Sequence, residues 1–65
     1  MTALREIRQR AGVSQVALAK KLGVTSSTVT QWESGVRNPN IVMVKRIANI
    51  FGVTTDELLA PIKID

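Results

Sequence analysis

Residues 14–35, SQVALAKKLGVTSSTVTQWESG, decide the fold of this chain, because they predict two short amphipathic helices joined by a tight turn. Ser14 is a good helix N-cap, and apolar residues recur at helical spacing in the stretch that follows it. Gly23 is placed to end this first helix, since glycine adopts positive φ without steric cost. Thr25 is then placed to cap a second helix over about 26–34.

The second helix of this pair has two chemically different sides. Val29 and Trp32 lie on one side, which we expect to pack, whereas Ser27, Thr28 and Gln31 lie on the other. These short, uncharged groups donate and accept hydrogen bonds, glutamine can pair with an adenine edge, and a threonine methyl can touch a thymine methyl. The pattern therefore suits base edges in the major groove, and the alternative is an ordinary solvated surface.

Length and composition limit the possible classes of protein. The 65 residues make one small domain near the lower size limit for a core without disulfides or metal, so we expect a dimer or a very regular helical core. The absence of cysteine and histidine argues against disulfides, thiolate zinc sites and the commonest acid–base residue. We therefore expect no enzyme activity, metal, cofactor or small-molecule ligand. No apolar run is long enough for a membrane span or signal peptide, so a cytoplasmic location is expected.

Positive charge is concentrated in the first four-fifths of the chain. Residues 1–52 hold eight Lys or Arg against Glu6 and Glu33, a net charge of +6, whereas residues 53–65 have a net charge of −2. A basic surface suits nucleic acid because neutralising phosphates releases counterions. The overall charge of +4 is also ordinary for a soluble domain, so charge alone leaves both interpretations open.

Three further helices are predicted outside this central pair, over about 2–11, about 40–51 and from a capping box at 54–57. All four glycines fall where a helix is expected to end, which agrees with an all-α, compact five-helix bundle. The core residues expected from these three helices are Leu4, Ile7, Ala11, Ile41, Val44, Ile47, Ala48, Phe51, Leu58 and Leu59.

The motif residues resemble the helix-turn-helix domain of the phage repressor/Cro type, also called the XRE family. The resemblance is carried by SQ at 14–15, LA at 18–19, LGVT at 22–25, QWESG at 31–35, NPN at 38–40 and FGVT at 51–54. It assigns residues 1–60 to one DNA-binding domain and leaves 61–65 as a C-terminal tail. That tail alternates apolar and polar residues after a proline, so it is either a short strand in a dimer contact or a frayed end.

The resemblance also implies roles for individual residues. Base-reading positions would be Ser26, Ser27, Thr28 and Gln31. Positions near the DNA backbone would be Gln15, Arg37, Asn38 and Asn40, and Thr25 joins them because a helix N-terminus favours a phosphate. The family pattern further implies a buried, structural ion pair between Arg8 and Glu33.

The sequence departs from the family pattern in two respects. Ala17 stands where many relatives carry a glutamate that completes a capping box with Ser14, so the first motif helix has a weaker start. No Arg or Lys lies between residues 22 and 36 to contact guanine, which predicts a preference for A·T-rich or shape-read sites.

The predicted function is sequence-specific binding of double-stranded DNA by a transcriptional regulator, most simply a homodimeric repressor of a pseudo-palindromic operator. The alternative is an antitoxin-like or other protein-interaction module with the same fold. An exposed apolar patch would favour the second interpretation. The residues considered for this patch or for a dimer contact are Val16, Val36, Val42, Met43, Val53 and Thr54.

Overall fold

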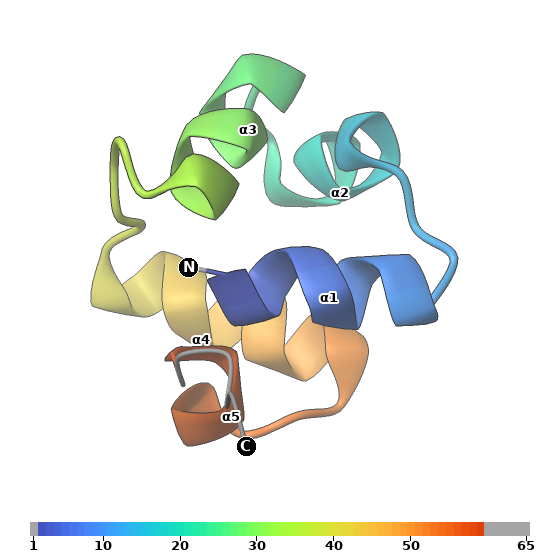
Figure 1. Ribbon diagram of the computed structural model, residues 1–65, viewed down its shortest axis with the longest axis vertical. Helices are drawn as coiled ribbons and strands as arrows, with labels where there is room; N and C mark the ends of the chain where they lie inside the picture. The colour runs from blue at the N-terminus through green and yellow to red at the C-terminus, as the bar shows by residue number, and fades with distance from the viewer. Residues whose placement is uncertain (1, 60–65) are drawn as a thin grey trace.

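Five helices account for most of residues 2–59, the part of the chain that the computed structural model describes (Figure 1). The all-α prediction is confirmed, and residues 2–59 contain no strand. The two alternatives for 61–65, a short strand or a frayed end, concern residues outside the described part of the chain. The helices are α1 (Thr2–Arg10), α2 (Gln15–Leu22), α3 (Ser26–Ser34), α4 (Ile41–Phe51) and α5 (Thr55–Leu59).

Side-chain caps and glycines set the limits of these helices. Four residues each accept a hydrogen bond from the backbone amide three residues later, over distances of 2.9 to 3.2 Å: Ser14, Thr25, Asn40 and Thr54. These bonds satisfy amides that have no partner within the helix. Gly23 and Gly35 end α2 and α3 with φ of +72° and +83°, a conformation that a residue with a Cβ rarely adopts. The predicted boundaries of the central helix pair are therefore confirmed.

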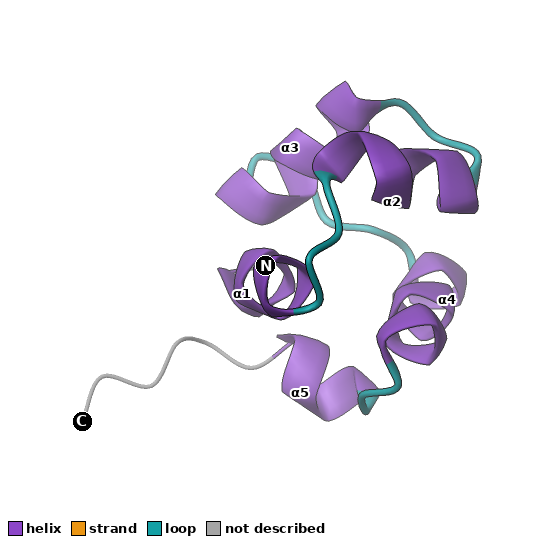
Figure 2. Cartoon of the chain, turned by 90° about the vertical axis from the view of Figure 1, so that its right-hand side faces the viewer, coloured by secondary structure: helices purple, strands orange, loops and turns teal. Residues whose placement is uncertain are grey.

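The helices are arranged with the α2–α3 pair at one end of the molecule and α5 at the other (Figures 1 and 2). Between them, α1 and α4 are both seen end-on in Figure 2. The helix α3 packs on α1, α2 packs on α4, and α5 packs on both α1 and α4. This closed arrangement holds α3 on the outside of the bundle with one side facing inward.

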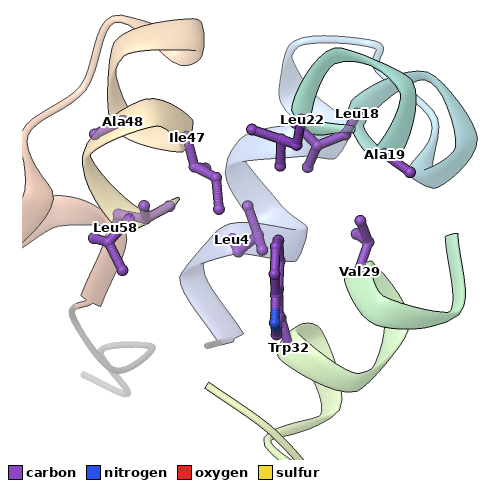
Figure 3. Close-up of a cluster of buried hydrophobic side chains, with 10 residues drawn as sticks. Leu4, Leu18, Ala19, Leu22, Val29, Trp32, Ile47, Ala48 and Leu58 are labelled. Atoms are coloured by element: carbon purple, nitrogen blue, oxygen red, sulfur yellow. The ribbon is translucent and has the colours of Figure 1, made fainter. Parts of the chain in front are cut away.

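The core receives at least one fully buried side chain from every helix (Figure 3). The largest of these are Leu4, Leu18, Val29, Ile47 and Leu58, one from each helix in chain order. Burying such a side chain contributes about 1.5–3 kcal/mol relative to leaving it exposed. Because α3 supplies both Val29 and Trp32 to this cluster, its rotation about its own axis is fixed by packing.

Three residues predicted in the core lie at the surface instead. Ala11 is exposed because α1 ends at Arg10 and Ala11 already belongs to the turn. Ile41 is 62% exposed because it opens α4, whose first turn projects at the edge of the bundle (Figure 1). Leu59 is 53% exposed, since consecutive helical residues point about 100° apart and Leu58 takes the inward position. Helical periodicity therefore predicted the inward-facing side of each helix correctly, but it failed for residues at the helix ends.

Candidate nucleic-acid interface

The turn between α2 and α3 is short and closed by its own hydrogen bonds. Gly23 ends α2 with a left-handed backbone conformation. The amide of the next residue, Val24, donates to the carbonyl oxygen of Ala19 over 3.0 Å. The Val24 side chain is half-buried against the core. Thr25 then starts α3 as its N-cap. Because both ends of the turn are bonded or packed, α3 is held in one orientation relative to α2.

The buried side of α3 consists of Val29, Trp32 and Glu33. On the rest of its surface Ser26, Ser27 and Thr30 are exposed, and Thr28 and Gln31 are half-buried. The four residues predicted to read bases, Ser26, Ser27, Thr28 and Gln31, therefore all lie on α3 outside its buried side. None of them carries a charge, so this surface offers hydrogen bonds and methyl groups rather than ionic contacts.

One side chain on the buried side of α3, Glu33, is a carboxylate with three polar partners. Arg8 of α1 donates from Nε to Oε2 over 2.6 Å and from Nη2 to Oε1 over 3.2 Å. Its third guanidinium nitrogen donates to the carbonyl oxygen of Val13 over 2.9 Å. Arg5 lies 3.5 Å from the same carboxylate, and its side chain is half-exposed. The ion pair implied by the family pattern is thus present, and it ties α1 and the α1–α2 loop to α3.

The ionisation of Glu33 depends on these partners. Burial by itself raises the pKa of the Glu33 carboxyl, but the hydrogen bonds from Arg8 and Gln15 and the charge of Arg8 outweigh burial. The pKa of Glu33 therefore lies below its ordinary value. The hydrogen bond to Glu33 likewise raises the pKa of Arg8. Both groups are charged at neutral pH, and each compensates the burial of the other.

Gln15 connects the start of α2 to α3. Its amide nitrogen Nε2 donates to Oε1 of Glu33 over 3.0 Å, and its oxygen Oε1 accepts from the hydroxyl of Thr30 over 3.0 Å. The structure therefore places Gln15 against α3, the helix that carries the residues predicted to read bases. Its contact with a DNA phosphate remains a prediction.

The other predicted backbone-contacting residues lie at the N-terminus of α3 and in the loop after it. Arg37, Asn38 and Asn40 are exposed in the segment between α3 and α4, and the amide of Arg37 donates to the carbonyl oxygen of Gln31 over 3.2 Å. The oxygen Oδ1 of Asn40 is occupied as the cap of α4. Thr25 Oγ1 accepts from the Thr28 amide and lies 3.0 Å from the Thr28 hydroxyl. These contacts fix the loop ends but leave the Arg37 guanidinium at the surface.

Exposed charges are unequally distributed between the two ends of the molecule. The exposed basic residues of the described part are Arg5, Arg10, Lys20, Lys21, Arg37, Lys45 and Arg46. Exposed acidic residues are Glu6 on α1 and Asp56 and Glu57 on α5, and α5 lies at the opposite end from α3 (Figure 1). The end of the bundle that carries α3 is therefore free of the α5 carboxylates, which would repel a phosphate backbone.

Residues 2–59 contain no group of three or more acidic, histidine or cysteine side chains placed to hold a metal ion. None of the five described helices has the length and apolar character that crossing a bilayer requires.

The comparison with known proteins agrees with this geometry. The profile of the helix-turn-helix family matches residues 4–58, so the chain belongs to that family, whose members of the phage repressor/Cro (XRE) type are DNA-binding transcriptional regulators. It is similar to the HTH-type transcriptional activator BcrR of Enterococcus faecalis, with 39% identity over 88% of this chain and 28% of the relative. It is also similar to the HTH-type transcriptional regulator ImmR of Bacillus subtilis, with 34% identity over 86% of this chain and 44% of the relative.

A third relative has nearly the same length as this chain. It is an uncharacterised HTH-type transcriptional regulator of Archaeoglobus fulgidus, 37% identical over 88% of this chain and 81% of the relative. The chain therefore spans less than half of the two bacterial relatives but most of the archaeal one.

Two residues that contact Glu33 or Gln15 were not identified from the sequence. Arg5 contacts Glu33 from α1, and Thr30 contacts Gln15 from α3. The signal for Arg5 was its spacing of three residues from Arg8, which places both on one side of α1. Thr30 gave no signal, because a threonine on an exposed helix surface is ordinary.

Proposed function

We propose that this chain binds double-stranded DNA sequence-specifically and acts as a homodimeric repressor on a pseudo-palindromic operator. The observation that carries the proposal is the uncharged polar surface of α3, presented by a helix that packing and turn geometry hold in one orientation. The major groove of B-DNA is about 12 Å wide and admits a single α-helix. In this proposal α3 enters the groove and α2 lies across the DNA backbone.

Base recognition is assigned to Ser26, Ser27, Thr28 and Gln31. Gln31 is half-buried, and no other described residue hydrogen-bonds its side-chain amide, which leaves both amide atoms available to an adenine edge. The Thr28 hydroxyl already contacts Thr25, so its methyl group is the part left for a thymine methyl. Because α3 has no arginine or lysine, we propose that A·T pairs are preferred at the positions it reaches.

Backbone contacts are assigned to Gln15, Thr25, Arg37, Asn38 and Asn40. Such contacts set the register of a protein on the duplex and carry no sequence information directly. The exposed cations on α1, α2, α4 and the α3–α4 loop support a salt-dependent, sequence-independent part of the affinity.

Dimerisation is proposed because one short helix in the groove buries little surface, and two half-sites one helical turn apart require two copies. Val42 is 63% exposed at the start of α4, and Thr54 is exposed before α5, so both are available for such a contact. The tail 61–65 is a further candidate. Sedimentation of the full chain against a version ending at Ala60 tests it: equal association removes the tail from the interface.

A second candidate function is favoured by one observation. Val16 and Val36 are exposed, Val36 at 72%, together with Val42. In an antitoxin-like or other protein-interaction module, a partner protein would cover exposed valines of this kind. Met43 does not join them, because it packs against the core.

Selection of bound sites from a random DNA duplex library tests the proposal. We expect enriched, two-fold symmetric sites with A·T pairs nearest α3 and affinity that falls steeply with salt. A transcription reporter carrying the selected site then separates repression from activation. Failure to enrich any duplex would contradict the proposed function and favour the protein-interaction alternative.

A further inference from the structure

A threonine on α3, Thr30, hydrogen-bonds to the side-chain amide of Gln15. The Thr30 hydroxyl donates over 3.0 Å to Oε1 of Gln15, with the carbonyl oxygen of Ser26 as a second acceptor at the same distance. On its other side, Gln15 donates from Nε2 to Oε1 of Glu33 over 3.0 Å. The two contacts come from α3 at positions three residues apart, so the amide of Gln15 is held between the exposed Thr30 and the buried Glu33.

The chemistry of the two partners fixes which way the Gln15 amide points. The Glu33 carboxylate is ionised and can only accept, so the Gln15 atom facing it must be nitrogen. The Thr30 hydroxyl supplies a proton to the oxygen at the other end of the amide. One hydrogen of Nε2 then remains, and no described residue accepts it. An oriented N–H of this kind is the group that a backbone phosphate accepts from.

We propose that Thr30 is a positioning residue for DNA binding that acts through Gln15. It orients the amide so that the remaining Nε2 hydrogen meets a phosphate, and it reads no base itself. This inference rests on the proposed DNA binding by α3 and Gln15. It assigns to the exposed surface of α3 two separate tasks: Ser27 and Gln31 select bases, and Thr30 holds the backbone contact in place.

The test compares Thr30→Val, which removes the hydroxyl at nearly constant shape, with Thr30→Ser, which keeps it. Affinities are measured for a duplex taken from the site selection and for random DNA, at one salt concentration. Loss of one oriented hydrogen bond predicts weaker binding of Thr30→Val to both duplexes, by roughly two- to tenfold. Thr30→Ser is expected to bind as the wild type does, and the selected base preferences are expected to stay unchanged.

The same measurements in a Gln15→Ala background show whether Thr30 acts through Gln15. There Thr30→Val is expected to change affinity by less than about twofold, since neighbours acting as one unit are not additive. Thr30→Ala gives a second removal of the hydroxyl with a better helix former, which separates the contact from helix stability. Thermal unfolding of each variant accompanies the binding data.

Three results would overturn the inference while leaving DNA binding intact. They are wild-type affinity for Thr30→Val and Thr30→Ala, an equal loss in the Gln15→Ala background, or an altered base preference. A wild-type chain that selects no duplex overturns the proposed function first, and the inference with it. The two failures are therefore distinguishable.

Discussion

The buried and exposed sides of α3 differ in what constrains their side chains. On the buried side, Val29 and Trp32 belong to the core, and Glu33 accepts hydrogen bonds from Arg8, Arg5 and Gln15. On the opposite side, Ser27 is exposed and Gln31 half-buried, and neither side chain hydrogen-bonds to another described residue. The buried side therefore determines the position of α3, and this leaves the residue types of the exposed side free to suit a ligand.

The largest effect is expected from breaking the buried ion pair. Arg8→Met leaves the fully buried Glu33 carboxylate without its shortest contact, and stranding a buried charge costs on the order of 3–5 kcal/mol. Since whole domains are stable by only about 5–15 kcal/mol, this variant should lose a large part of its unfolding free energy and unfold at a much lower urea concentration than the wild type. Urea unfolding followed by circular dichroism measures the change.

Arg10→Met is the matched control on the same helix. Arg10 also forms a 2.6 Å pair, with Glu6, but its side chain is 76% exposed. Solvent-exposed pairs contribute about 0–1 kcal/mol, so this variant should unfold nearly as the wild type does. An equal loss of unfolding free energy in Arg8→Met and Arg10→Met would contradict the prediction that the buried pair stabilises the fold more than the exposed pair.

Acid should weaken the buried side through Glu33. Its pKa is lowered in the folded chain, so the stabilisation is fully present above the unfolded value of about 4.3. That stabilisation is lost as the pH falls through the lower, folded pKa. Glu33→Gln should be less stable than the wild type at neutral pH, and the gap should shrink in acid. The unfolding free energies of the two proteins are measured as a function of pH. A difference between them that stays constant down to low pH would contradict this prediction.

A smaller effect is expected at Thr25, the N-cap of α3. Thr25→Ala removes the hydroxyl that accepts from the Thr28 amide and should cost about 1 kcal/mol of unfolding free energy. Thr25→Ser keeps that acceptor and serves as the control in the same denaturation experiment. A destabilisation shared by both variants would assign the effect to the lost methyl group instead of the cap.

The smallest change in stability is expected on the exposed side. Ser27→Ala removes a hydroxyl that has no hydrogen-bond partner among the described residues, and such surface changes usually stay within about 0.5 kcal/mol. Thermal unfolding should therefore match the wild type, while affinity for the selected duplex falls. A destabilisation comparable to that of Thr25→Ala would mean that Ser27 serves the fold.

The features predictable from the sequence were those that local chemistry determines. Caps at Ser14 and Thr25, a left-handed glycine at Gly23 and the inward pair Val29 and Trp32 all follow from spacing and residue type. The errors at Ala11, Ile41 and Leu59 arose at helix ends, where exposure depends on the exact last or first residue of the helix and on which neighbouring side chain points inward.

In the site, too, the features set by local sequence were predictable, whereas those set by tertiary packing were not. The polar surface of α3 was predictable because helical spacing alone gathers its residues, and the Arg8–Glu33 pair was implied by the family resemblance. The contact from Thr30 to Gln15 joins residues fifteen positions apart and depends on how α2 crosses α3. No periodicity or cap signals such a contact, so only the tertiary structure reveals it.

Repeating the site selection with Gln31→Ala tests most directly whether the exposed side of α3 reads bases. If Gln31 reads a base, preference for one base pair in each half-site weakens by about 1–3 kcal/mol, while affinity for random DNA is unchanged. Selected sites identical to those of the wild type at every position would contradict it.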